Sequence, residues 1–391
     1  MKLRIKASVG LALLALSVVA VPITVWAQII VPAPSSGARA PTTERPQDPR
    51  KPFPYKEEEV TYEGKQPGVR LAGTLTLPPG RKKRFPAVLL VTGSGAQDRN
   101  ETMLGHRPFL VLADYLTRRG IAVLRVDDRG IGGSYGASGS DTSASFAGDV
   151  EAGIEFLAKR KDIDPTRIGL IGHSEGGMIA PMVAAKSSNV AFIVLMAAPG
   201  VKGEKLLEQQ AALVAKARGA SDEMIALNRE TQEKMFELLR QGKDYIATES
   251  ELREIWGEAK NKMSADDIRA MGDPDVVARQ QIRAVMSPWF RYFLAYDPRE
   301  ALEHTRCPVL AINGELDLQV PPRQNLPAIE AALKTGGNPD FTVTELPSLN
   351  HLFQTAQTGS PAEYAKIEET LSPIALQTMG DWIVAHTKKS S

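Results

Sequence analysis

The chain has 391 residues, of which 43% are hydrophobic and 24% are charged. These proportions are typical of a globular protein and exclude disorder throughout the chain. With 47 basic and 46 acidic residues the net charge is +1, which argues against a general nucleic-acid-binding protein or a polybasic membrane-surface protein. A single cysteine excludes an internal disulfide.

The first 27 residues have the layout of a secretory signal peptide. Basic residues precede a long apolar run, and Ala27 ends a small-residue cleavage site. We therefore expect an exported protein, either periplasmic or secreted. The apolar run is also long enough to span a bilayer, so an uncleaved membrane anchor is the alternative, and only in that case would the membrane be a partner.

Residues 28–54 are rich in proline and small polar residues and predict a linker, because such a segment cannot bury a core. From residue 55 to 202, strand and helix patterns alternate. Two runs with alternating apolar residues flank a Gly-Lys-Gln-Pro-Gly turn and predict a β-hairpin. The elements expected next are strand 86–95, helix 108–120, a strand beginning at 121, helix 145–160, strand 167–173, helix 175–186 and strand 190–200.

The alternation stops after Gly200. Residues 203–300 are rich in Glu, Lys, Gln, Ala and Met and predict helices only. The strand and helix patterns resume in 301–391, with strands at "CPVLAING" and "FTVTELP". The sequence therefore predicts one α/β domain, with a mostly parallel sheet covered by helices on both faces and a helical cap inserted at 203–300.

The sequence "GHSEG" at 172–176 joins an apolar strand directly to a helix. It fits the G-x-S-x-G pattern of a nucleophile elbow, where small neighbours allow a serine to stand clear of the sheet. The pattern alone is common, but the predicted strand before it and helix after it are the context that it requires. We expect Ser174 to be a nucleophile.

A nucleophilic serine needs a base, and the base needs a carboxylate to orient it. Of the five histidines, His351 lies in a loop after the last predicted strand, which is where the chain order Ser, Asp, His places the base. The acid is expected after the preceding strand, in "LAINGELDLQVPP". Asp317 is preferred there, and Glu315 is the alternative.

A tetrahedral intermediate also needs two backbone N–H donors for its oxyanion. We expect one at Glu175, which follows the nucleophile at a helix N-terminus. The other is expected at Ser94 in "TGSGAQDRN", through its amide, with Gly95 as the alternative.

The chain resembles the α/β-hydrolase superfamily of serine hydrolases. The resemblance rests on five segments that occur in the expected order: "VTGSGAQDRN", "RVDDRGIGGS", "GHSEGG", "NGELDLQVP" and "LNHLFQ". The similar branch contains secreted esterases, serine aminopeptidase-like enzymes and prolyl-oligopeptidase-like enzymes, and the resemblance covers about residues 55–388. It implies the α/β-hydrolase fold, with Ser174 as nucleophile, Asp317 as acid and His351 as base, and with the amides of Ser94 and Glu175 as the oxyanion hole. Many members have histidine where this chain has Thr92. In "DDRG" we expect Arg129 to pair with a carboxylate.

We expect a carboxylic ester hydrolase that works through an acyl-enzyme and needs no cofactor and no metal, because histidine is scarce and no HExxH-type spacing occurs. A serine peptidase or aminopeptidase would use the same triad and is the first alternative. A non-catalytic binding protein on the same fold is the second.

Aromatic residues gather in "SPWFRYFLAYDP" at 287–298, near the end of the predicted cap. We expect Trp289 and Tyr292 to form a wall of the substrate pocket. Packing of the cap against the core would explain the same residues without any contact to substrate.

Overall fold

The computed structural model describes residues 45–80 and 84–388 and contains an eight-stranded sheet. The strand order is β1-β2-β4-β3-β5-β6-β7-β8. The hairpin β1–β2 is antiparallel and joins β4 antiparallel, while every pairing from β4 to β8 is parallel. The strands are β1 (Lys56–Glu63), β2 (Arg70–Leu77), β3 (Phe85–Val91), β4 (Ala122–Val126), β5 (Ile163–His173), β6 (Phe192–Met196), β7 (Val309–Gly314) and β8 (Phe341–Leu346).

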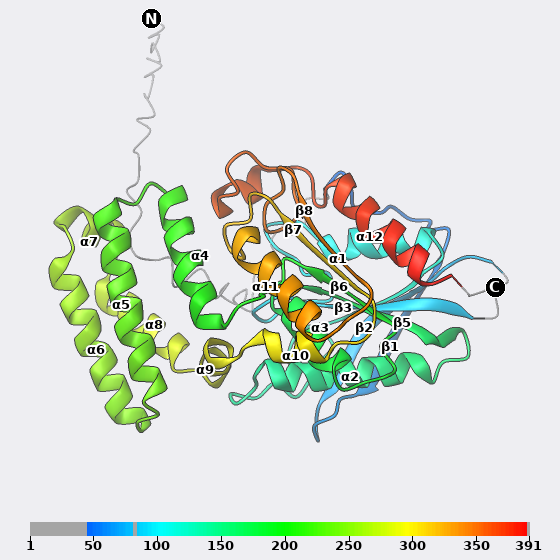
Figure 1. Ribbon diagram of the computed structural model, residues 1–391, viewed down its shortest axis with the longest axis horizontal. Helices are drawn as coiled ribbons and strands as arrows, with labels where there is room; N and C mark the ends of the chain where they lie inside the picture. The colour runs from blue at the N-terminus through cyan, green and yellow to red at the C-terminus, as the bar shows by residue number, and fades with distance from the viewer. Residues whose placement is uncertain (1–44, 81–83, 389–391) are drawn as a thin grey trace, which may run out of the picture.

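Helices cover both faces of the sheet, which confirms the predicted fold class (Figure 1). Alternate residues of β3 pack into different clusters, Leu89 on one face and Leu90 on the other, as the two-residue period of a strand requires. One face carries α1 (Pro108–Arg118) and α12 (Pro373–His386). The other face carries α2 (Ser143–Ala158), α3 (Glu175–Ala184), α10 (Pro298–His304) and α11 (Pro322–Thr335).

Between β6 and β7 the described chain forms helices and no strand. We call residues 203–295 the helical insertion, and in Figure 1 most of it stands to one side of the sheet. The N-cap residues of α5 to α9 are Ser or Asp, and each side chain accepts a backbone N–H of the first turn, which explains where these helices begin. The helices are α4 (Gly203–Ala217), α5 (Asp222–Arg240), α6 (Tyr245–Lys262), α7 (Ala265–Met271), α8 (Pro274–Val285) and α9 (Pro288–Ala295).

The end of the predicted linker lies against the core. Residues 45–54 form no helix or strand, but the Gln47 side chain accepts the N–H groups of Thr370 and Leu371 at 2.5 and 3.0 Å. The carboxylate of Asp48 pairs with Arg107 at 2.6 Å. This part of the predicted linker is therefore bound, because its polar side chains have partners on the core.

The predicted signal peptide or anchor, 1–27, lies outside the described residues. Within the part of the chain that the structure describes, no helix is long and apolar enough to cross a membrane.

Candidate active site

The carboxyl ends of the parallel strands meet at one edge of the sheet, which is where ligands bind in open α/β sheets. The loop after β3 carries Ser94, and β5 runs into Ser174. The loop after β7 carries Asp317, and the loop after β8 carries His351. The topology therefore brings residues from distant parts of the sequence to the same edge.

Ser174 stands at the sharp junction between β5 and α3. Its φ of 54° and ψ of −118° are unusual for a residue with a side chain, and such strain persists only where the surroundings hold it. Two backbone bonds hold it: Ser174 N donates to Met196 O at 2.8 Å, and Gly177 N donates to Ser174 O at 2.9 Å.

Glycines make this junction possible because backbone approaches backbone closely. A Cβ on Gly172 would lie 2.1 Å from Gly176 O, and a Cβ on Gly176 would lie 2.2 Å from Val91 O. Neither backbone oxygen can move aside without disturbing a strand or a helix. The glycines around Ser174 are thus required by the tight packing of β3, β5 and α3.

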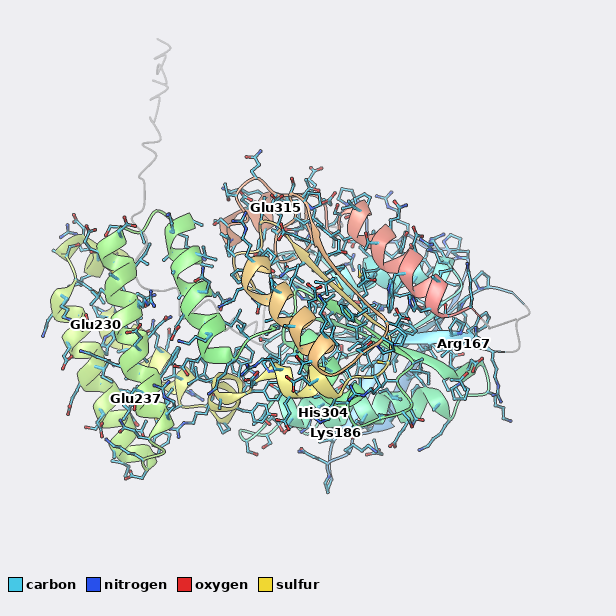
Figure 2. The ribbon with its side chains drawn as sticks, in the orientation of Figure 1. Arg167, Lys186, Glu230, Glu237, His304 and Glu315 are labelled. Atoms are coloured by element: carbon cyan, nitrogen blue, oxygen red, sulfur yellow. The ribbon has the colours of Figure 1, made fainter. Side chains whose placement is uncertain are left out.

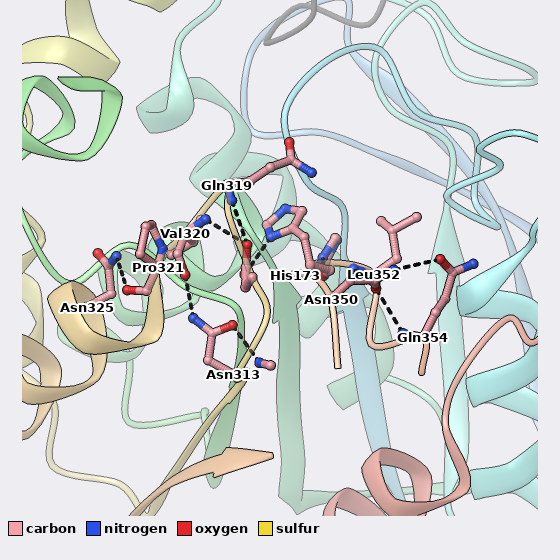
Figure 3. Close-up of polar contacts among 12 residues, drawn as sticks. His173, Asn313, Gln319, Val320, Pro321, Asn325, Asn350, Leu352 and Gln354 are labelled. Atoms are coloured by element: carbon pink, nitrogen blue, oxygen red, sulfur yellow. Dashed lines mark hydrogen bonds and ion pairs between the residues drawn. The ribbon is translucent and has the colours of Figure 1, made fainter. Parts of the chain in front are cut away.

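His351 and Asp317 form a buried hydrogen-bonded pair with 2.8 Å between Nδ1 and Oδ2. The other oxygen of Asp317 accepts the backbone N–H groups of Gln319 and Val320 at 2.8 and 2.9 Å (Figure 3). These bonds fix the carboxylate, and the carboxylate in turn fixes Nδ1 of His351 as the protonated nitrogen. Nε2 is then the nitrogen able to accept a proton.

Ser174 and His351 line one pocket of about 70 Å³, together with Ser94 from the loop after β3. Ser174 is partly exposed, whereas His351 and Asp317 are only 5% and 2% exposed. The alternative acid, Glu315, is exposed and accepts the N–H of Ser348 at 2.9 Å; Figure 2 shows it at the outer side of the core.

The loop after β3 passes directly beside Ser174, since a Cβ on Gly93 would lie 3.3 Å from Ser174 Cβ. Gly93 N donates to Glu101 Oε1 at 2.7 Å and is thereby occupied. The next amide in the loop belongs to Ser94. Glu175 is the first residue of α3, so no helix carbonyl one turn earlier can accept a hydrogen bond from its N–H group.

The "DDRG" segment after β4 holds this loop in place. Asp128 accepts Thr92 Oγ1 at 2.8 Å and Gln97 N at 2.9 Å, so Thr92 serves to anchor the loop. Burial raises the pKa of Asp128 to about 8, although these two hydrogen bonds oppose the rise. Arg129 binds the carboxylates of Asp149 and Asp141, in agreement with the predicted pairing.

The side chain of Glu175 links the elbow to the helical insertion. Trp289 Nε1, on α9, donates to Glu175 Oε1 at 2.8 Å, and Ser143 Oγ donates to the same oxygen at 2.6 Å. Burial raises the pKa of Glu175, and the polar groups of Ser143, Trp289 and Ser94 offset part of that rise.

The two aromatic residues that were expected to form a wall of the substrate pocket, Trp289 and Tyr292, lie in different places. Trp289 lines the pocket and stacks on Phe293, with 5.5 Å between ring centroids. Tyr292 is not among the pocket residues and stacks on Tyr296 at 5.6 Å.

The sequence did not indicate the roles of Glu101 and His173. His173 Nε2 lies 3.0 Å from His351 O, and His173 Nδ1 lies 2.9 Å from Glu101 Oε1. The position of His173 beside Ser174 was a weak signal for its role. Glu101 gave none, because it is 72 residues away from His173 in the chain.

Among the described residues, no group of three or more His, Cys, Asp or Glu side chains has a geometry that could hold a metal ion. The groups that the structure brings together at this edge are a serine hydroxyl, an imidazole with its carboxylate, and backbone amides.

Two relatives by sequence are each 26% identical to this chain. One is Esterase EstD of Thermotoga maritima, matched over 317 residues that make up 81% of this chain and 64% of EstD. The chain thus spans less than two thirds of EstD. The other is an uncharacterized 31.7 kDa protein in the traX-finO intergenic region of Escherichia coli, matched over 65% of this chain and 80% of that protein.

Two solved structures share the fold at 16% sequence identity. The α/β hydrolase GrgF from Penicillium sp. sh18 aligns with a TM-score of 0.52 over 85% of this chain and 99% of GrgF. The hypothetical protein PA2218 from Pseudomonas aeruginosa aligns with a TM-score of 0.50 over 90% of this chain and 98% of that one. The profile of the alpha/beta hydrolase family matches residues 88–367, which is more than half of the chain. Together with the fold, this match shows that the chain belongs to the α/β hydrolase family.

Proposed function

We propose that the protein hydrolyses carboxylic esters through an acyl-enzyme formed on Ser174. One observation carries the proposal: a serine held in a strained strand-to-helix turn shares a pocket with His351, which is already oriented by Asp317. Strained backbone at such a position is characteristic of functional sites. The similarity to Esterase EstD supports an ester as substrate.

In the first half-reaction, Ser174 Oγ attacks the ester carbonyl carbon while His351 Nε2 takes the serine proton. The Asp317 carboxylate stabilises the imidazolium that forms. The carbonyl oxygen becomes an oxyanion and accepts the N–H groups of Ser94 and Glu175. When the carbon–oxygen bond to the alcohol breaks, His351 returns the proton to the alcohol, and the acyl group stays on Ser174.

In the second half-reaction, water replaces the alcohol. His351 takes a proton from the water, the hydroxide oxygen bonds to the acyl carbon, and the same two amides stabilise the second oxyanion. Collapse of this intermediate releases the carboxylic acid, and the proton returns to Ser174. Each triad residue therefore recovers its starting state.

The helical insertion is proposed to act as a cap over this chemistry. Two helices of the insertion line the pocket that contains Ser174: α4 through Leu206, Leu207 and Gln210, and α9 through Trp289 and Phe293. These mostly apolar side chains would exclude bulk water and shape the space for the substrate's carbon chain.

The test is a substrate panel offered to the purified protein: short and long p-nitrophenyl esters beside aminoacyl anilides. The proposal predicts that kcat/KM for the esters exceeds that for the anilides by a factor of at least about 100. Preferential hydrolysis of the anilides would assign the site to a peptidase, which uses the same residues on an amine leaving group. No turnover of either class would favour the binding-protein alternative.

A further inference from the structure

The pocket around Ser174 contains three glutamine side chains, and they differ in what they bind. Gln97 Nε2 donates to Ser94 O at 3.3 Å, and Gln319 Nε2 donates to the hydroxyl of Tyr364 at 2.9 Å. Both of these amides are thus held by the protein itself. The third glutamine is Gln210, on α4 of the helical insertion.

Gln210 is buried, with 8% of its surface exposed, and its side-chain amide makes no hydrogen bond to any residue in the described ranges. Its amide oxygen and nitrogen are both accessible to solvent. The Nε2 atoms of Gln232 and Gln281, inside the insertion, are not accessible and also lack a hydrogen-bond partner within the same ranges. Gln210 lines the pocket, so its amide, which no described side chain or backbone group binds, would face the space in which the substrate would lie.

The other residues of the helical insertion that line the pocket are apolar or aromatic. Leu206 and Leu207 precede Gln210 on α4, and Trp289 and Phe293 lie on α9, which packs against α4. A bound carbon chain would displace water from the amide without replacing the lost hydrogen bonds. A buried polar group that loses its partner in this way costs about 1–3 kcal/mol, which is a factor of about 5 to 150 in kcat/KM.

We propose that Gln210 selects esters that carry a neutral hydrogen-bonding atom, such as an ether, hydroxyl or amide oxygen, along an otherwise apolar chain. The amide is uncharged and offers two donors and one acceptor, which suits such groups. A site that hydrogen-bonds a substrate atom rejects analogues lacking that atom much more strongly than an apolar pocket rejects a missing methylene. This inference rests on the proposed ester hydrolysis and deepens it.

The test uses p-nitrophenyl octanoate and analogues in which one chain methylene, at successive positions, is replaced by an ether oxygen. A second series makes the same replacement in the alcohol chain of alkyl butyrates. The readout is the ratio of kcat/KM for the ether to that for the hydrocarbon ester. Comparing this ratio between parent and variant cancels the intrinsic effect of the oxygen on reactivity and hydrophobicity.

In Gln210→Met the side chain keeps its length and loses both donors, and in Gln210→Glu it keeps its shape and loses the NH₂ group. At the best position in one series, the parent's ratio is expected to exceed that of each variant by about tenfold. Gln209→Met and Gln209→Glu make the same chemical changes at an exposed position of the same helix, outside the pocket lining, and are the controls that should leave the ratio unchanged. Melting temperatures of all variants verify that they are folded.

Equal ratios in the parent and both Gln210 variants, at every position of both series, would overturn the inference. If the parent hydrolysed none of these esters, the proposed function itself would fail. The two failures are distinguishable because the second abolishes turnover of the hydrocarbon esters as well.

Discussion

His173 donates its ring Nε2–H to the backbone oxygen of His351 across 3.0 Å, so the residue before the proposed nucleophile supports the loop of the proposed base. On its other side, His173 Nδ1 meets Glu101 Oε1 at 2.9 Å, and that oxygen also accepts Gly93 N–H. One buried pair therefore connects three elements: the elbow, the loop of the proposed base and the loop of the proposed oxyanion amide. We propose that Glu101 and His173 position the catalytic groups without touching the substrate.

This pair predicts a pH-dependent stability. Burial opposes the charge on His173, but the adjacent Glu101 carboxylate, aided by Asp317, outweighs burial and raises the pKa of His173. Because the folded pKa lies above the ordinary value of 6.5, the resulting stabilisation is complete below about pH 6.5 and is lost as the pH rises through the folded pKa. Glu101→Gln should therefore lower the melting temperature most near pH 6, by the equivalent of about 1–3 kcal/mol, and progressively less toward pH 9.

Thermal unfolding of parent and variant between pH 5 and pH 9 measures this difference. Glu315→Gln is the matched control, since it makes the same chemical change at an exposed position and should have little effect at any pH. If Glu101→Gln lowered the melting temperature by the same amount at every pH between 5 and 9, a charged His173 would be contradicted.

The choice of acid predicts unequal effects for two neighbouring carboxylates. Asp317→Asn would present an NH₂ group to His351 Nδ1 and favour the wrong tautomer, so kcat should fall by a factor of about 10⁴. Glu315→Gln should change kcat by less than about threefold, because the Glu315 side chain is exposed and accepts the N–H of Ser348 at the surface. Steady-state kinetics of both variants on one ester measure the two losses of kcat. A larger loss of kcat in Glu315→Gln than in Asp317→Asn would assign the acid to Glu315.

The close backbone approach at the elbow predicts that Gly172→Ala is strongly destabilising. Its Cβ would lie 2.1 Å from Gly176 O, and overpacking of this kind costs about 1–3 kcal/mol or more. Gly257→Ala is the control. Apart from its chain neighbours and the backbone of its own helix, no atom of the described residues lies within 4 Å of a Cβ there, and its place inside α6 means that alanine should stabilise the protein by about 0.5–1 kcal/mol. Urea unfolding of the parent and both variants measures their free energies of unfolding. If Gly172→Ala were as stable as the parent or as Gly257→Ala, the elbow would have room for a methyl group.

Trp289 has two roles in the structure that substitution can separate. Trp289→Phe keeps a ring against Phe293 but loses the bond to Glu175, so it should cost about 1 kcal/mol of stability. Trp289→Ala also removes part of the pocket lining, so it should change the preference among ester chain lengths more than Trp289→Phe does. Tyr292→Phe, outside the pocket lining, should leave the preference unchanged. Identical chain-length profiles for the parent and Trp289→Ala would assign Trp289 to packing alone.

The sequence predicted features that depend on local pattern and chain order. The strands and helices of the core lie where the apolar periodicity indicated, because a buried parallel sheet requires continuous apolar runs. β5 begins at Ile163, earlier than the predicted 167, because Pro165 obscured its first residues. The short 3₁₀ helix η2 (Pro361–Lys366) was not predicted, since its sequence has no apolar period.

Features that depend on contacts between distant side chains could not be predicted from the sequence. The bond between Trp289 and Glu175 joins residues 114 positions apart, and no pattern specifies which indole reaches which carboxylate. For the same reason, the sequence placed Trp289 and Tyr292 together, whereas only Trp289 lines the pocket. Gln210 was not distinguishable from other polar residues of an amphipathic helix until its surroundings were known.

Covalent labelling of the nucleophile tests the central claim most directly. The parent protein is treated with a fluorophosphonate probe, and the modified peptide is identified by mass spectrometry beside a Ser174→Ala variant with an unchanged melting temperature. We predict one labelled residue, Ser174, no labelling in the variant, and a loss of ester hydrolysis by a factor of at least about 10³. Labelling of a different serine, or a variant that hydrolyses esters at nearly the parental rate, would contradict the assignment of Ser174 as the nucleophile.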